Sequence, residues 1–316
     1  MEGIISISPP IFEEVRMPIQ TIDNVSFQMK EVCDFSFLSK YGRVFCVFDQ
    51  NDSGNISFGV DNGKEKKFIK IAGAKTANSC ISSQKAVENL KIATSVYNDL
   101  AHPHLIQLIE HFSYKDLYIA VFKWVDGECL FDYWNFEKYS NNSELIAPRE
   151  RFIKMPCDKK LNAFNTVFEF LTFIESKNYV AVDFYDGSIM YDFENDIVTV
   201  CDVDFFRKNP LLNDIGEDFW GTKRLKSPEE YTIGEKIDTI TNVFTLGALL
   251  FHFFGSYTDE EIARMYEKNA FIPCRYETWE LSENLYKVAL KAVQSNRENR
   301  YSSMKSFYEA WKDNIS

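Results

Sequence analysis

The sequence predicts an α+β fold in two parts, a small antiparallel sheet with one helix followed by a larger, mainly helical part. Between residues 35 and 122, short apolar runs alternate with polar turns, a pattern typical of antiparallel strands. After Asp126-Gly127, apolar residues recur at helical spacing instead. The chain has 316 residues, of which 45% are hydrophobic, so each part can bury a core of its own.

Five strands and a single helix are predicted in the first part. Polar turns separate three runs that form a meander, over residues 43–48, 56–60 and 67–71. A helix follows and ends before Pro103, which blocks its continuation. The apolar residues that mark this helix are Ala86, Leu90, Ala93, Tyr97 and Leu100. Strands over residues 105–112 and 117–122 complete a five-stranded antiparallel sheet.

Helices dominate the second part, with one short hairpin over residues 189–191 and 197–201. The helices expected there cover residues 161–171, 238–254, 258–268, 285–293 and 304–311. The third of them opens with a capping box, in which Thr258 and Glu261 satisfy each other's backbone N–H groups. The chain therefore divides into an N-terminal extension (1–34), a sheet part (35–122), and a linker with the helical part (123–316).

The charge and the cysteine pattern exclude several functions. With 35 basic and 47 acidic side chains, the formal charge of −12 repels phosphate backbones, so neither nucleic acid nor an anionic membrane is an expected partner. The seven cysteines form no C-x-x-C pair, which argues against a disulfide framework or a zinc site. The N-terminus lacks the pattern of a signal peptide, and the most apolar run, Val243 to Phe254, is too short to span a bilayer. We expect a soluble, cytoplasmic protein.

Three motifs carry groups suited to phosphate chemistry. Phe68-Ile69-Lys70-Ile71 places an ammonium group on a strand between apolar neighbours. A later loop, Ala181-Val182-Asp183-Phe184-Tyr185-Asp186-Gly187-Ser188, carries Asp183 and, five residues on, Ser188. Val200-Cys201-Asp202-Val203-Asp204 ends a strand with carboxylates, which are preferred Mg²⁺ ligands. The sequence therefore offers one cation on a strand and two anionic loops that follow it in the chain.

In this order, the motifs resemble those of protein kinases over residues 35 to 315. The stretch His102-Pro103-His104-Leu105 is similar to the turn that follows helix C of that family. Gly221-Thr222 with Ser227-Pro228-Glu229 resembles the end of the activation segment, and Arg300 stands where the family pairs an arginine with this glutamate. The resemblance implies a bilobal protein-kinase-like fold, with a five-stranded sheet and one helix in the N-lobe and a mainly helical C-lobe.

The resemblance also implies roles for individual residues, with ATP and Mg²⁺ as cofactors. Lys70 would contact the α- and β-phosphates, and Asp183 would orient the acceptor hydroxyl and take its proton. Asp202 and Ser188 would ligate Mg²⁺. In the hinge, Phe122 would be the gatekeeper residue. The backbone of Lys123 and Val125 would bind the adenine edge.

Several positions depart from the family pattern. Ala181 and Val182 replace a histidine and an arginine, and Asp204 replaces a glycine. The turn at residues 49–55 lacks the glycine-rich sequence, and Ala93 stands where the glutamate of helix C is expected. Asn242 replaces an aspartate that braces the catalytic loop. His252 is expected to be a packing residue.

Three functions stay open. The first is an ATP- and Mg²⁺-dependent protein-kinase-like phosphotransferase acting on a Ser or Thr hydroxyl of a protein. The second is a pseudokinase, a binding or scaffolding module without catalysis, which the departures favour. The third, a small-molecule kinase, is disfavoured because such enzymes generally lack the segment at residues 221–229.

Overall fold

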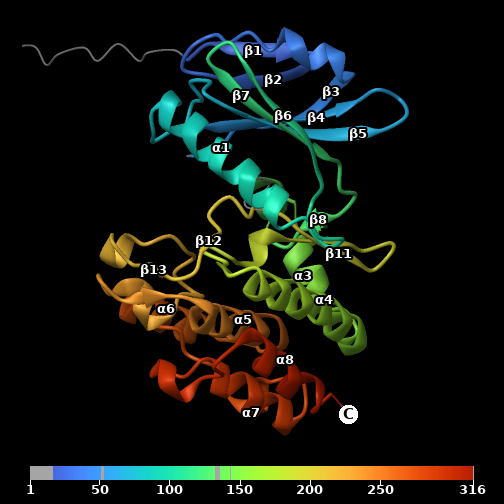
Figure 1. Cartoon of the computed structure of the whole chain (residues 1–316). Helices are drawn as coiled ribbons and strands as arrows, with labels where there is room; N and C mark the ends of the chain where they lie inside the picture. The colour runs from blue at the N-terminus through green and yellow to red at the C-terminus, as the bar shows by residue number, and fades with distance from the viewer. Residues whose placement is uncertain (1–16, 51–52, 132–135, 143, 316) are drawn as a thin grey trace, which may run out of the picture.

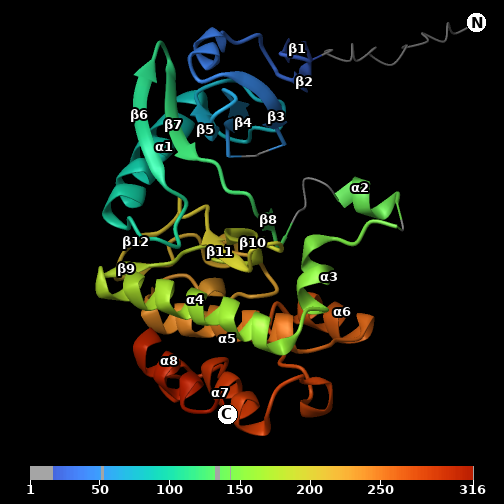
Figure 2. The same cartoon turned by 90° about the vertical axis from the view of Figure 1, so that its right-hand side faces the viewer.

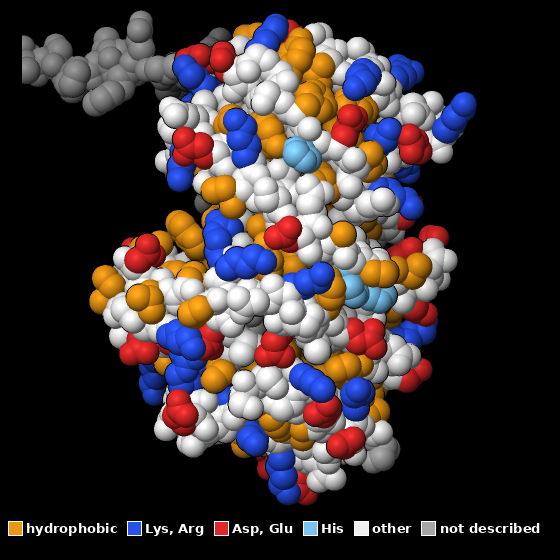
Figure 3. All heavy atoms as spheres, viewed as in Figure 1, with side chains coloured by type: hydrophobic (Ala, Val, Ile, Leu, Met, Phe, Trp, Pro, Cys, Tyr) orange, Lys and Arg blue, Asp and Glu red, His pale blue; other side chains and the backbone are white. Residues whose placement is uncertain are grey.

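The computed structural model describes residues 17–50, 53–131, 136–142 and 144–315, and confirms the α+β class (Figure 1). The strands within residues 19–123 gather at one end of the molecule, and the helices that follow residue 136 gather at the other, with short strands between them. Acidic and basic side chains are interspersed over the face shown in Figure 3. The negative net charge is therefore not gathered into one acidic patch on that face.

Five strands form one antiparallel sheet in the order β3-β4-β5-β7-β6. Their bounds are β3 Arg43–Phe48, β4 Asn55–Asp61, β5 Lys66–Ala72, β6 Leu108–Tyr114 and β7 Leu117–Lys123. The strand expected from residue 105 starts three residues later, at Leu108. Residues before it turn toward the helical part, because the N–H of Ile106 bonds the carbonyl of Val200 at 2.9 Å.

Helix α1, Ser83–Asp99, is the single helix beside this sheet (Figure 2). Ser82 caps it, with its hydroxyl accepting from the N–H of Lys85 at 3.2 Å. Its buried side chains include those predicted from the periodicity: Ala86, Leu90, Ala93 and Tyr97. This face packs toward the sheet, and it brings Tyr97 within 4.8 Å of the ring of Phe122 on β7.

A hairpin of β1, Ile19–Ile22, and β2, Val25–Gln28, precedes the sheet. Its Phe27 ring meets Phe35 and Phe58 edge to face, at centroid distances of 5.8 and 5.2 Å. Residues 17–34, which belong to the predicted N-terminal extension, therefore pack on the sheet part. Each of the two strands has only four residues, too few for a clear signal in the sequence, and residues 1–16 lie outside the described part.

The helical part contains seven described helices. They are α2 Phe136–Ser140, α3 Pro148–Ile153, α4 Cys157–Ser176, α5 Thr239–Phe254, α6 Asp259–Lys268, α7 Glu283–Ala292 and α8 Met304–Lys312. Helices α2 and α3 were not predicted, because neither is long enough to show a helical period. The capping box of α6 is confirmed, with Thr258 N to Glu261 Oε2 at 2.9 Å. No described helix has the length and apolar character needed to cross a membrane.

Short strands connect these helices and carry the loops. They are β8 Glu128–Cys129, β9 Tyr179–Val180, β10 Ile189–Asp192, β11 Ile197–Val200, β12 Arg207–Lys208, β13 Leu211–Leu212 and β14 Lys236–Ile237. The predicted hairpin corresponds to β10 and β11, which pair in antiparallel fashion. Strand β8 adds to its other edge, so the sheet order is β11-β10-β8.

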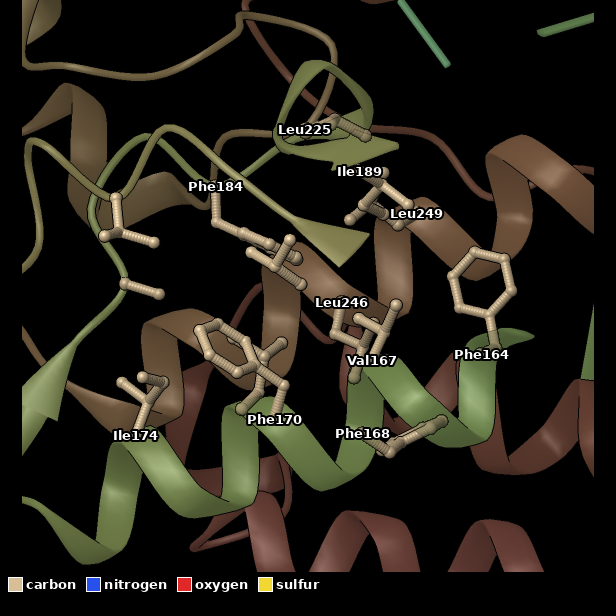
Figure 4. Close-up of a cluster of buried hydrophobic side chains, with 14 of the residues drawn as sticks. Phe164, Val167, Phe168, Phe170, Ile174, Phe184, Ile189, Leu225, Leu246 and Leu249 are labelled. Carbon is tan, nitrogen blue, oxygen red and sulfur yellow. The ribbon is translucent and has the colours of Figure 1, made fainter. Parts of the chain in front are cut away.

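A core of buried side chains joins α4 and α5 and anchors two loops. Figure 4 shows Phe184 near Leu246 of α5 and Phe170 of α4, and Leu225 near Ile189 and Leu249. Phe184 directly follows Asp183, and it is 3% exposed. Burying a side chain of this size contributes about 2–3 kcal/mol. The core therefore holds the loop of Asp183 in place.

A buried ion pair joins residue 229 to the C-terminal region, as the sequence predicts. Arg300 donates to Glu229 through Nη1 at 2.7 Å and Nη2 at 2.9 Å. Both side chains are almost fully buried. The hydroxyl of Thr241 on α5 also donates to Glu229, at 3.0 Å.

We predict that Glu229→Gln lowers the free energy of unfolding by about 3–5 kcal/mol, because it leaves Arg300 charged and unpaired in the interior. Urea denaturation at neutral pH measures the change. Glu298→Gln, at an exposed position, is the matched control and is expected to stay within about 0.5 kcal/mol of wild type. Equal stability of the two variants would contradict the prediction.

Candidate functional site

Lys70 of β5 connects the sheet to the helical part. Its Nζ lies 2.6 Å from Oδ2 of Asp204 and 3.4 Å from Oδ1 of Asp202, residues more than 130 positions away in sequence. The neighbours Ile69 and Ile71 are fully buried on the opposite face of the sheet. Alternation along the strand thus directs Lys70 away from that core. The structure brings the predicted cation together with one of the two predicted carboxylates.

The ion pair keeps Lys70 charged. Burial by itself would lower the pKa of Lys70, but the carboxylates of Asp204 and Asp202 outweigh it and raise this pKa above its ordinary value. The side chain of Lys70 is only 11% exposed, whereas that of Asp202 is 45% exposed. The carboxylate of Asp202 is therefore accessible to a ligand, whereas Lys70 is buried and paired with Asp204.

Asp204 holds Lys70 in a way the sequence did not predict. Its Oδ1 accepts a hydrogen bond from the hydroxyl of Tyr97 at 3.0 Å, and its Oδ2 binds Lys70. The same Tyr97 oxygen accepts from the N–H of Val203 at 3.3 Å. Burial raises the pKa of Tyr97 well above its ordinary value, so the phenol stays protonated and donates. Helix α1 thus positions Lys70 through Tyr97 and Asp204.

No glutamate of α1 contacts Lys70. Ala93 is fully buried, and Glu88 is exposed and lies 3.8 Å from Lys85 on its own helix. Asp204 therefore supplies the carboxylate to Lys70, in exchange for a glutamate of the helix. No sequence signal identifies this exchange, because the two positions are far apart in the chain.

Asp183 and Asp202 share an uncommon backbone conformation. Their φ angles are 57° and 55°, in the left-handed region that costs a non-glycine residue roughly 1–2 kcal/mol. Strain of this kind gathers at functional sites. Six other described non-glycine residues, five of them Asp or Asn, also have a positive φ, so this conformation accompanies the two motifs and does not by itself mark a site.

Asn242 of α5 braces the loop of Asp183. Its Oδ1 accepts from the N–H of Ala181 at 2.8 Å, and its Nδ2 donates to the carbonyl of the same residue at 2.9 Å. An amide can donate and accept, whereas a carboxylate can only accept. Asn242 therefore still braces the loop, by bonding both backbone groups of one residue.

Tyr185 belongs to the loop of Asp183 and is affected by the carboxylates of both loops. Burial raises the pKa of its phenol, and the charges of Asp202 and Asp183 raise it further. Both carboxylates therefore lie close enough to the Tyr185 ring to affect its pKa.

Ser188, a predicted metal ligand, is fully buried. Its hydroxyl accepts from the N–H of Tyr185 at 3.4 Å and so lies inside the turn. This geometry does not support a metal contact, and the role of Ser188 stays a prediction. Among the described residues, no group of three or more His, Cys, Asp or Glu side chains is arranged to hold a metal.

The predicted hinge lies at the end of β7. Phe122 is 2% exposed and packs against Tyr97 and Phe68, with centroid distances of 4.8 and 6.1 Å. The N–H of Lys123 bonds the carbonyl of Gln107 at 2.9 Å. The N–H of Val125 has no hydrogen-bond partner among the described residues. It is therefore an open donor where an adenine edge is expected.

Two cavities of about 430 Å³ each lie away from Lys70. The first lies by the hairpin β1–β2 and includes Asp49 and Gln50, from the turn that replaces a glycine-rich loop. Residues 51 and 52 of this turn lie outside the described part. The second lies beyond the hinge, between Asp126 and the turn after β10.

A second polar cluster, the arginine cluster, consists of Arg149, Asp186, Arg224 and His252. Asp186 is fully buried, forms an ion pair with Arg224, and lies 3.3 Å from Nε2 of His252. Nε of Arg149 donates to Nε2 of His252 at 2.7 Å. His252 is therefore more than the packing residue predicted. The sequence shows no signal for the cluster, because its members come from separate segments.

Comparison with models of known protein families found no match, and comparison with curated proteins found no significant match. The order of the motifs and the geometry of Lys70, Asp202 and Asp204 are therefore the observations from which function is inferred.

Glu230 is a buried acid next to the segment that ends at residue 229. Its Oε2 accepts from the N–H and the hydroxyl of Ser227, at 2.7 and 2.9 Å. Burial raises its pKa from 4.5 to about 7, although these hydrogen bonds oppose the shift. The folded protein therefore favours the protonated acid.

We predict that the stability contributed by Glu230 is complete below pH 4.5 and is lost as the pH rises through about 7. Relative to Glu230→Gln, wild type should lose up to about 3 kcal/mol of unfolding free energy between pH 5 and pH 8. Urea denaturation across this range measures the difference. The exposed Glu235→Gln is the control and should follow wild type; parallel curves for wild type and Glu230→Gln would refute the prediction.

Proposed function

We propose that the chain is a protein-kinase-like phosphotransferase that moves the γ-phosphate of ATP to a Ser or Thr hydroxyl of a protein. The observation that carries the proposal is the meeting of Lys70 from β5 with Asp202 and Asp204 after β11. A bilobal kinase-like arrangement and a cytoplasmic location belong to the same proposal.

Each residue has a role that its environment supports. Lys70 is a fixed cation suited to the α- and β-phosphates, and the open N–H of Val125 suits the adenine edge. Asp202 is the exposed carboxylate suited to Mg²⁺, which binds proteins through one or two carboxylates and takes further oxygens from substrate phosphates. Bound Mg²⁺ supplies charge neutralisation between the β- and γ-phosphates. Asp183 orients the acceptor hydroxyl and accepts its proton.

A single carboxylate is therefore enough for the proposed Mg²⁺ site. The ion requires no dedicated cluster of protein ligands, because the nucleotide contributes several oxygens. The burial of the Ser188 hydroxyl consequently does not argue against the proposed Mg²⁺ site. Asp204 acts on Lys70 as a positioning residue.

A pseudokinase is the second candidate. Nζ of Lys70 is already bound to Asp204 at 2.6 Å, where it would otherwise contact phosphates. The hydroxyl of Ser188 bonds the N–H of Tyr185 within its own turn. Both observations favour a module that binds a protein partner without catalysis. A small-molecule kinase is less favoured, because residues 221–229 form a segment that such enzymes generally lack.

We predict that ATP with Mg²⁺ raises the melting temperature more than ATP alone, and that Asp202→Asn removes this difference. Transfer of labelled γ-phosphate to a generic protein substrate should fall at least about 100-fold in Asp183→Asn and in Asp202→Asn. The exposed Asp259→Asn is the control and should retain transfer. A Mg²⁺-dependent shift without transfer supports the pseudokinase, and no shift with any nucleotide refutes the phosphotransferase and favours a scaffolding module.

We also predict that Asp204→Asn raises KM for ATP and lowers kcat, with kcat/KM falling roughly 10- to 100-fold, because Lys70 loses its orientation. Tyr97→Phe should show the same direction with a smaller change, since it removes a single hydrogen bond to Asp204. Steady-state kinetics with varied ATP measures both. Tighter nucleotide binding by Asp204→Asn would mean that Asp204 competes with ATP for Lys70.

A further inference from the structure

The arginine cluster holds two guanidinium groups but a single carboxylate. Asp186 neutralises Arg224, and this ion pair is largely buried. Arg149 forms no ion pair with any residue that the structure describes; its Nε and Nη2 instead point at the ring nitrogens of His252, at 2.7 and 3.4 Å. Nη1 of Arg224 lies 3.0 Å from the same ring.

The imidazole does not supply a compensating negative charge, and at neutral pH it adds no positive one. Burial lowers the pKa of His252 to about 4, so the ring is uncharged near pH 7. The single lone pair on Nε2 can then accept from Nε of Arg149, at 2.7 Å. The cluster therefore carries one positive charge in excess of its negative charge.

Arg149 is well suited to bind an anion from outside. Burial lowers the pKa of Arg149, although the carboxylates of Asp186 and Glu150 raise it. A guanidinium has five N–H donors, and Arg149 directs only two of its nitrogens toward His252. The planar group matches carboxylate and phosphate oxygens in pairs. Since Arg149 is half-buried, an incoming anion would meet a partly dehydrated cation that salt screens weakly.

The cluster adjoins the loop of Asp183. The guanidinium of Arg224 lies 5.0 Å from the ring of Phe131, and this ring lies 6.1 Å from that of Tyr185. Tyr185 is the residue on which the charges of both Asp183 and Asp202 act. If the acceptor Ser or Thr of a peptide lies at Asp183, a residue a few positions away in that peptide would therefore lie next to the arginine cluster.

We propose that the arginine cluster binds an acidic side chain of the acceptor protein, so that the chain selects Ser or Thr residues near Asp, Glu or a phosphorylated residue. The inference rests on the proposed function, because it assigns a substrate class to the same site. With a formal charge of −12, the protein repels acidic peptides at long range. Selection of such peptides consequently requires a local cation, and Arg149 supplies it.

The test uses the full chain and Ser-centred peptides that carry Glu, phosphoserine, Gln or Lys at one neighbouring position. Fluorescence anisotropy measures binding without nucleotide, and labelled ATP measures transfer. Wild type should prefer the Glu and phosphoserine peptides over the Gln peptide by roughly ten-fold. Comparison of the Glu and phosphoserine peptides decides which of the two anions the site favours.

Arg149 is the position to change, because removing Arg224 would leave Asp186 buried without its ion pair. Arg149→Gln should abolish the acidic preference, and Arg149→Glu should reverse it toward the Lys peptide. Arg43→Gln removes the same charge from an exposed position on β3 and should leave the preference intact. Melting temperatures establish that each variant is folded; if Arg149→Gln does not fold, Arg149→Met, which removes the charge and keeps a long side chain, replaces it.

The outcomes separate the two proposals. Acidic preference in binding without any phosphate transfer overturns the proposed catalysis and keeps the acidic site. Transfer with no acidic preference, or with a preference that Arg149→Gln leaves unchanged, overturns the acidic site and keeps the catalysis. An Arg149 that only orders His252 would give this last result.

Discussion

The ion pair between Lys70 and Asp204 is the interaction on which the arrangement of this molecule depends. Lys70 is part of the sheet, Asp204 follows a strand of the helical part, and Tyr97 binds the same carboxylate from α1. A lysine that is only 11% exposed needs such a partner, because an unpaired charge there would lose much of its hydration. Strand β5, helix α1 and the segment after β11 therefore meet at this carboxylate, and their contact joins the sheet part to the helical part.

The helical core makes that meeting possible by holding strained loops. Asp183 and Asp202 both have positive φ angles, and neither conformation would persist in a free loop. Phe184 buries the first loop in the core, and Asn242 bonds both backbone groups of Ala181. Packing energy from α4 and α5 thus offsets strain at the proposed site.

Two arginines of this protein, Arg300 and Arg149, differ in how their charge is compensated. Arg300 and Glu229 satisfy each other fully, and their role is structural. Arg149 instead faces a neutral imidazole, so that its charge is available to a ligand. The contrast between a paired and an unpaired arginine is what distinguishes a brace from a candidate binding site.

The sequence by itself determined the class of fold, the places of β3, β4, β5 and β7 to within a residue, and the long helices. These features depend on periodicity and turn residues, which are local. Only the tertiary structure decided that residues 17–34 join the sheet part, that β6 starts at Leu108, and that Asp204 rather than a helix glutamate partners Lys70. The arginine cluster belongs to the same group, because ion pairs depend on distances between segments that lie far apart in the chain.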